Sequence, residues 1–159
     1  MTLKGQLQQA ISNMPLFSSG EQLLEISHDS QELRCQLVAL DSLACSFTKL
    51  ALRADTLAAM SLDQLKHTAE QLSARLTYLL EPISPIEVDA HGCVVQMRSN
   101  PPQKETERTS YYELLVSRSG ELSLCRFSRV AGEQRQMIPA QVTREVLARL
   151  AADFSSVAG

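Results

Sequence analysis

Met60–Leu79 reads MSLDQLKHTAEQLSARLTYL, and its spacing of apolar residues decides the central element of the fold. Leucine or alanine recurs at alternating intervals of three and four, which is the period of an amphipathic helix. Ser61 can cap this helix with its hydroxyl, Gln64 completes a capping box, and Pro82 lies just beyond the end. We therefore expect a helix over 62–80. Its narrow leucine seam fits either a helix lying on a sheet or a helix that meets its copy in a dimer.

Val142–Phe154, VTREVLARLAADF, repeats this arrangement near the other end of the chain. In both segments an apolar residue precedes a hydroxyl cap, and a leucine follows four helical positions later (Leu65 and Leu147). Each helix also follows a run of short alternating strands. The order of elements therefore predicts a possible pseudo-repeat, although residue identity does not support a duplication.

The N-terminal part of the chain predicts one helix and three strands. Residues 3–13 place apolar side chains on one helical face, and Pro15 stops the helix. Strands are expected at 21–27, 33–40 and 43–52, separated by Asp-Ser turns. In the third strand the alternation puts Leu43, Cys45 and Phe47 on one face and Leu50 and Leu52 on the other.

Two hairpins are expected in the C-terminal half, and each register follows from its turn. A turn at His91-Gly92 pairs Ala90 with Cys93, Val88 with Val95 and Ile86 with Met97, all on one face. A turn at Ser119-Gly120 pairs Tyr112 with Phe127, Leu114 with Cys125 and Val116 with Ser123 on one face, and Leu115 with Leu124 and Glu113 with Arg126 on the other.

Both faces of the second hairpin carry apolar residues, so we expect helices or a second subunit to cover both sides. Residues 100–109, between the hairpins, are polar and contain two prolines, which indicates an exposed, mobile connection.

The composition is that of an ordinary globular protein: 159 residues, 44% hydrophobic and 21% charged, without tryptophan. Net charge is −3, with −5 in residues 1–92 and +2 in residues 93–159, which argues against non-specific nucleic-acid binding.

The start has no secretory pattern and no stretch is apolar enough to span a membrane, so we expect a cytoplasmic protein. The cysteines form no CxxC pair and are expected to be reduced, buried thiols in strands: Cys35, Cys45, Cys93 and Cys125.

Catalytic and cofactor motifs are missing from the sequence. His28 lies in a His-Asp-Ser turn, but three neighbours along a turn cannot converge as a triad does. The histidines and cysteines have no metal-ligand spacing, so neither a metal nor another cofactor is expected. One constellation could bind a small anion on a sheet face: Arg98, Tyr111, Glu113 and Arg126. The same residues could equally form a surface salt-bridge ladder.

The element order, the size and the acidity resemble those of the class I type III secretion chaperones. The resemblance extends over most of the chain and rests on architecture rather than on a sequence motif. It implies an α-βββ-α-ββ-α core, a homodimer, and binding of extended effector segments. This chain differs from the family in its extra hairpin and its basic C-terminal half, so no binding residue is carried over.

We therefore expect one α+β domain over 1–159 with sub-parts 1–80 (α-βββ-α) and 84–154 (ββ-ββ-α), in which helices pack on an antiparallel, twisted sheet. The favoured function is a non-enzymatic protein- or peptide-binding module that self-associates as a homodimer. A small-anion-binding domain and an enzyme with an unfamiliar site are the alternatives. Neither a nucleic acid nor a membrane is expected as a partner. The interface candidates are Leu65, Leu72, Leu76, Leu115 and Leu124.

Overall fold

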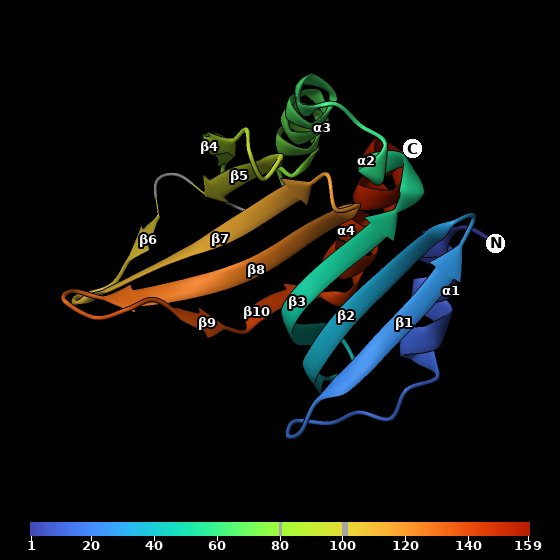
Figure 1. Ribbon diagram of the computed structural model, residues 1–159. Coiled ribbons are helices and arrows are strands. Elements are labelled where there is room, and N and C mark those ends of the chain that lie inside the picture. The colour runs from blue at the N-terminus through green and yellow to red at the C-terminus, as the bar shows by residue number, and fades with distance from the viewer. Residues whose placement is uncertain (80, 100–101) are drawn as a thin grey trace.

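One antiparallel sheet, built from two meanders, organises the chain in the computed structural model (Figure 1). The structure describes residues 1–79, 81–99 and 102–159. The strands of the described residues are β1 (Gln22–His28), β2 (Gln31–Leu40), β3 (Ala44–Ala54), β4 (Ile83–Asp89), β5 (Val94–Ser99), β6 (Gln103–Lys104), β7 (Arg108–Ser117), β8 (Glu121–Val130), β9 (Gln136–Ile138) and β10 (Ala140–Thr143). The helices are α1 (Leu3–Ser12), α2 (Asp55–Ala58), α3 (Leu62–Arg75) and α4 (Arg144–Ala158).

The two meanders join through their last long strands. The strand order is β1-β2-β3-β8-β7-β5-β4, while the short strands β6, β9 and β10 pair with β7, β8 and β3. This confirms the α+β class with a single antiparallel sheet. Three short elements were not expected from the sequence, α2, β6 and β10, whereas β9 lies at the short extended piece expected over 137–139. The expected mobile connection at 100–109 is therefore partly a strand, since Gln103 and Lys104 pair with Ser110 and Thr109, whereas residues 100 and 101 lie outside the described part.

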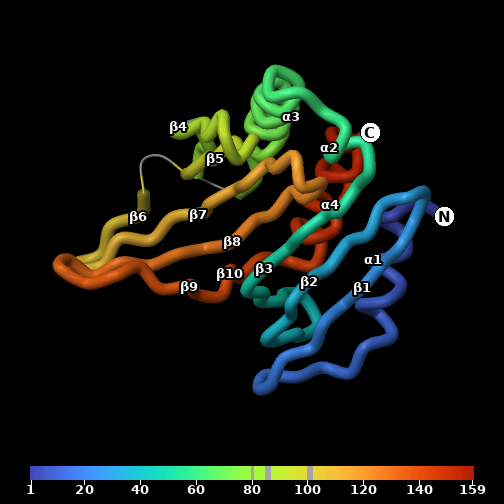
Figure 2. The backbone as a smooth tube through the Cα atoms, in the orientation of Figure 1, coloured from blue at the N-terminus to red at the C-terminus, as the bar shows by residue number. Residues whose placement is uncertain are grey.

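Helices α1, α4 and α3 lie together on one face of the sheet, with α4 in contact with both of the others (Figure 2). Each helix that follows a meander packs on the other meander. Helix α3 follows β3 but contacts β4, β5 and β7, whereas α4 follows the second meander but contacts β3, β10 and α1. The core lies between these helices and the sheet, where alternate strand residues such as Cys35, Leu50 and Leu114 are fully buried.

The leucine seam of α3 is intramolecular. Ser61 and Gln64 form the expected capping box, but the helix ends at Arg75, earlier than the expected residue 80, which lies outside the described part. Of the interface candidates, Leu65, Leu72, Leu76 and Leu124 are at most 1% exposed in the single chain, and only Leu115 is half-buried. These four leucines are core residues, so the interface prediction is wrong for them.

The register of β7 with β8 is shifted by one residue from the expected one. Leu114 opposes Leu124 and Tyr112 opposes Arg126, because the turn contains three residues (118–120) instead of two. Gly120 has a φ of +97°, a conformation that glycine adopts readily and that often ends a three-residue hairpin turn. A shift of one residue moves every side chain of one strand to the other face relative to its partner.

The β4–β5 hairpin follows the expected register only near its turn. Val88 opposes Val95, as expected, but a bulge between Pro85 and Glu87 shifts the remainder, so that Pro85 opposes Met97. The side chain of Ile86, expected opposite Met97, lies outside the described part. The turn spans 90–93 rather than two residues, so Cys93 lies in the turn, half-buried, with a φ of +50°. The other three cysteines are buried in strands, as expected.

Candidate functional site

Three of the four residues predicted as an anion site lie together on the outer face of β5 and β7, the face opposite the helices. Arg98 of β5 opposes Glu113 of β7, and its guanidinium lies 4.5 Å from the centre of the Tyr111 ring. Glu113 is buried, and it accepts a hydrogen bond from Gln96 Nε2 at 2.8 Å. The sheet register therefore places these side chains beside one another.

Arg135 completes this cluster from the loop before β9. Its Nη1 donates to Glu113 Oε2 at 2.5 Å and to the Tyr111 hydroxyl at 3.3 Å, and its guanidinium lies 3.8 Å from the centre of the Phe127 ring. The hydrogen bond to Glu113 raises the pKa of Arg135, so the guanidinium stays charged. Sequence reasoning missed Arg135, because a polar turn has no periodicity that assigns its side chains to a face.

Arg126 lies on the opposite face, so the prediction that it shares a face with Tyr111 and Glu113 is wrong. The shifted register places it beside Tyr112, whose ring centre lies 4.5 Å from the guanidinium. Arg126 Nη1 lies 3.1 Å from Glu81 Oε2, and Nη2 donates to Gln103 Oε1 at 3.1 Å. Burial raises the pKa of Tyr112 despite the nearby guanidinium. Arg126 therefore belongs to a separate, largely buried polar cluster.

In each cluster an internal carboxylate faces the guanidiniums. Glu113 Oε2 accepts from Arg135 and lies 3.8 Å from Arg98 Nε, so one internal carboxylate serves both cations of the outer face. On the inner face, the carboxylate of Glu81 pairs with Arg126. An external anion would have to compete with a carboxylate that the protein already holds in place. The structure therefore favours the salt-bridge alternative at these positions.

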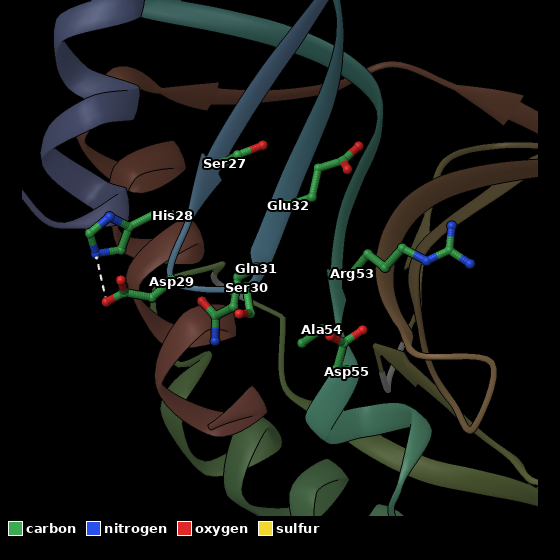
Figure 3. Close-up of a pocket in the computed structure, with 9 residues that line it drawn as sticks. All are labelled: Ser27, His28, Asp29, Ser30, Gln31, Glu32, Arg53, Ala54 and Asp55. Atoms are coloured by element: carbon green, nitrogen blue, oxygen red, sulfur yellow. Dashed lines mark ion pairs between the residues drawn. The ribbon is translucent and has the colours of Figure 1, made fainter.

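A hollow of about 440 Å³ lies where the β1–β2 turn meets the end of β3 (Figure 3). Its lining is polar and includes Ser27, Glu32, Arg53 and Asp55. His28 points away from these side chains, toward α1, where its Nδ1 is 2.9 Å from Gln6 Nε2 and its Nε2 is 3.2 Å from Asp29. Because the imidazole approaches neither serine hydroxyl of the hollow, the His-Asp-Ser turn does not form a nucleophile–base pair.

Strand β1 forms one edge of the sheet, and its outer edge is unpaired. The two-residue turn at 29–30 makes His28 and Gln31 a hydrogen-bonded pair. In the alternating antiparallel pattern, the backbone N–H and C=O groups of Leu23, Glu25 and Ser27 then point away from β2. Throughout the described part of the chain, no backbone or side-chain group hydrogen-bonds to these three residues from the outer side.

The face of β1–β3 that the helices leave uncovered is polar and hollowed. A depression of about 360 Å³ there is lined by Leu23, Arg34, Gln36, Thr48, Lys49, Ala51 and Glu121. Its charges are largely paired, because Arg34 contacts Glu32 of the same strand at 2.6 Å and Lys49 of β3 contacts Glu121 of β8 at 2.9 Å. Leu23 is 49% exposed at the border between this face and the free edge. The face itself resembles an ordinary solvated sheet surface, so the free edge is its distinctive feature.

Comparison with models of protein families, with curated proteins and with solved structures found no match to this chain. No group of three or more metal-ligating side chains lies close enough together to hold an ion, as far as the described residues show. None of the helices described is long and apolar enough to cross a membrane.

Proposed function

We propose that this protein is a non-enzymatic binding module that takes up an extended peptide segment as an additional strand along the free edge of β1. The observation that carries this proposal is the unpaired outer edge of a seven-residue strand. Backbone groups of such an edge bind an extended chain through regular hydrogen bonds, the mode called strand addition. The additional strand would lie beside β1 and continue the sheet.

The edge has only one of the features that usually protect an exposed strand, the charged side chain of Glu25 at its centre. Folded proteins guard edges with charged residues, above all lysine, and with proline, a bulge or a covering segment. Strand β1 reads QLLEISH, without proline or lysine, and its seven residues pair with β2 without interruption. Leu24 and Ile26 are buried on the helix side of the sheet. These core contacts fix β1 in position while its outer edge stays unpaired.

The remaining surfaces offer weaker support for binding. The leucine seam is enclosed in the core, and the arginine clusters are occupied by internal carboxylates. The resemblance to class I type III secretion chaperones, which bind extended effector segments, points in the same direction as the free edge. Homodimer formation stays a separate prediction, without the four core leucines as its interface.

The test selects peptides from a display library of unstructured segments and measures amide hydrogen exchange of the full chain with each selected peptide. Strand addition predicts new protection of the amides of Leu23, Glu25 and Ser27, because these N–H groups would donate to the added strand. Peptides that bind without protecting these three amides would overturn the proposal.

A proline at position 25 separates edge binding from folding. Glu25→Pro removes an N–H that points away from β2, so the β1–β2 pairing should persist, as it does for prolines on natural edge strands. We expect this variant to fold and to lose peptide binding, while Glu25→Thr, which keeps the N–H and the strand propensity, retains binding. Equal binding by the proline and threonine variants would contradict strand addition.

A further inference from the structure

The free edge of β1 is acidic, which bears on the chemistry of the segment that it would bind. Glu21 immediately precedes the strand and Glu25 lies at its centre, four residues apart, so both side chains lie on the uncovered face of the sheet. Strand β1 itself contains neither lysine nor arginine. The carboxylate of Glu25 is 51% exposed and can meet a side chain of an added strand.

Neighbouring cations leave this charge only partly compensated. Arg34 of β2 lies 3.9 Å from Glu25 Oε2, but its Nε contacts Glu32 at 2.6 Å, so one guanidinium serves two carboxylates. Glu21 accepts a hydrogen bond from the neutral side chain of Gln36 at 3.0 Å. Glu21, Glu25, Glu32 and Arg34 therefore carry a net charge of −2 beside the edge.

The other face of an added strand would meet a different environment. Leu24 and Ile26 are 9% and 8% exposed and face the helices, so strand residues directly opposite them would border the apolar core. On the uncovered face, the residue opposite Leu23 would contact a side chain that is 49% exposed. Opposed residues on one face of an antiparallel pair lie close enough for charge and apolar contact to select a sequence.

We infer that the segment taken up by β1 is a basic, alternating strand, with lysine or arginine four positions apart opposite Glu25 and Glu21 and with apolar residues opposite Leu24 and Ile26. This inference rests on the strand addition proposed above. In an antiparallel orientation, the residues opposite positions 27 to 21 read polar, apolar, basic, apolar, apolar, polar, basic. The free edge thus selects its ligand by charge on one face and by apolar contact on the other.

A second copy of this chain fits the edge poorly. When two β1 strands overlap along their whole length, the register is centred on position 25, and Glu25 then opposes its own copy. Directly opposed like charges destabilise a strand pair, and two acidic edges have no basic residue to offer each other. Charge complementarity therefore favours a basic peptide over a homodimer at this edge.

The test compares two soluble peptides that differ only in charge, with Gly-Ser flanks at both ends. One contains Thr-Val-Lys-Val-Val-Thr-Lys, and the matched control contains Thr-Val-Glu-Val-Val-Thr-Glu. Titration of the full chain at low salt should show binding of the lysine peptide at least about fivefold tighter, with a preference that falls as salt screens the charges. The double variant Glu21→Lys, Glu25→Lys should reverse the preference, and Glu25→Pro should bind neither peptide.

The possible outcomes separate this inference from the proposed function. If both peptides bind equally and Glu25→Pro abolishes both, strand addition stands and charge selection is overturned. If the designed peptides do not bind but library peptides without the basic spacing protect the β1 amides, the inference fails while the proposed function survives. If the protein alone forms a dimer that Glu25→Pro dissociates, the occupant is a second copy and the inference is overturned. If the double variant Glu21→Lys, Glu25→Lys binds the glutamate peptide more tightly than the lysine peptide, this result supports the inference.

Discussion

Glu113 connects side chains on the outer face of β5 and β7, because two arginines depend on its one buried carboxylate. Its side chain is 6% exposed, whereas those of Arg98 and Arg135 are 38% and 39% exposed. Glu113→Ala would leave both cations without their carboxylate, although each can turn partly toward water. We therefore expect a loss of about 1–3 kcal/mol in the free energy of unfolding, below the full cost of breaking a buried pair. Urea denaturation measures this change.

Glu121→Ala is the matched control for this change. Glu121 is also a glutamate on the uncovered side of the sheet and also contacts a cation, Lys49, at 2.9 Å. Its side chain and that of Lys49 are 37% and 47% exposed, so the pair should contribute at most about 1 kcal/mol. Equal losses for the two variants would show that the burial of Glu113 does not matter.

The candidate cluster could be predicted from the sequence only in part, and single residues explain why. Arg98, Tyr111 and Glu113 share a face, since alternation along a strand assigns faces reliably. Arg126 was placed on the wrong face because one additional turn residue, ending at Gly120, changes the register without changing the pattern of either strand. Arg135 reaches Glu113 from a loop, where side-chain direction depends on tertiary contacts.

Among the elements, α3 shows most clearly how tertiary packing decides what a periodic pattern means. Leu72 is fully buried and lies in the last turn of the helix that covers β4, β5 and β7. Leu72→Ala should lower the free energy of unfolding by about 2–5 kcal/mol, the usual cost of a cavity at a buried leucine. The molar mass measured by light scattering should not change, since the Leu72 side chain is fully buried within the single chain.

Glu70→Ala, an exposed substitution on the same helix, is the control and should change stability by at most about 0.5 kcal/mol. A stable Leu72→Ala protein with a smaller molar mass than wild type would instead make the seam an intermolecular contact and contradict the burial seen in the single chain.

Strands and helices with strong periodicity were predicted well, and irregularities within them were not. The helix at 3–13, the three N-terminal strands and both hairpins exist close to their expected bounds, and the helix expected over 62–80 begins where expected but ends at Arg75. In β3, however, Phe47 opposes Leu37 and Leu50 opposes Cys35, so both face the core, contrary to the two-faced expectation. The pairing of β2 with β3 shifts register near Gln36, which brings Phe47 and Leu50, three residues apart, to the same face. Such a shift does not show in the alternation of apolar and polar residues along the sequence.

At the scale of the whole molecule, the two sub-parts complete each other. The sheet joins them where β3 pairs with β8, through Leu50–Leu124 and Leu52–Leu122 among others. Helix α3 of the first sub-part covers the second meander, and α4 of the second covers β3 and α1 of the first. Tyr78 donates a hydrogen bond to Asp153 at 2.6 Å, which ties the segment after α3 to α4. This reciprocal arrangement is compatible with the predicted pseudo-repeat.

The arrangement predicts how the chain behaves when it is cut between the sub-parts. Fragments 1–80 and 81–159 should each be largely unfolded alone, because each would expose the apolar face that the other's helix covers. Mixed at equal concentration, they should recover the circular dichroism and amide protection of the intact chain. Leu72→Ala in the first fragment should weaken reassembly, and Glu70→Ala should not. Independent folding of either fragment would show that the crossed helices are not needed for stability.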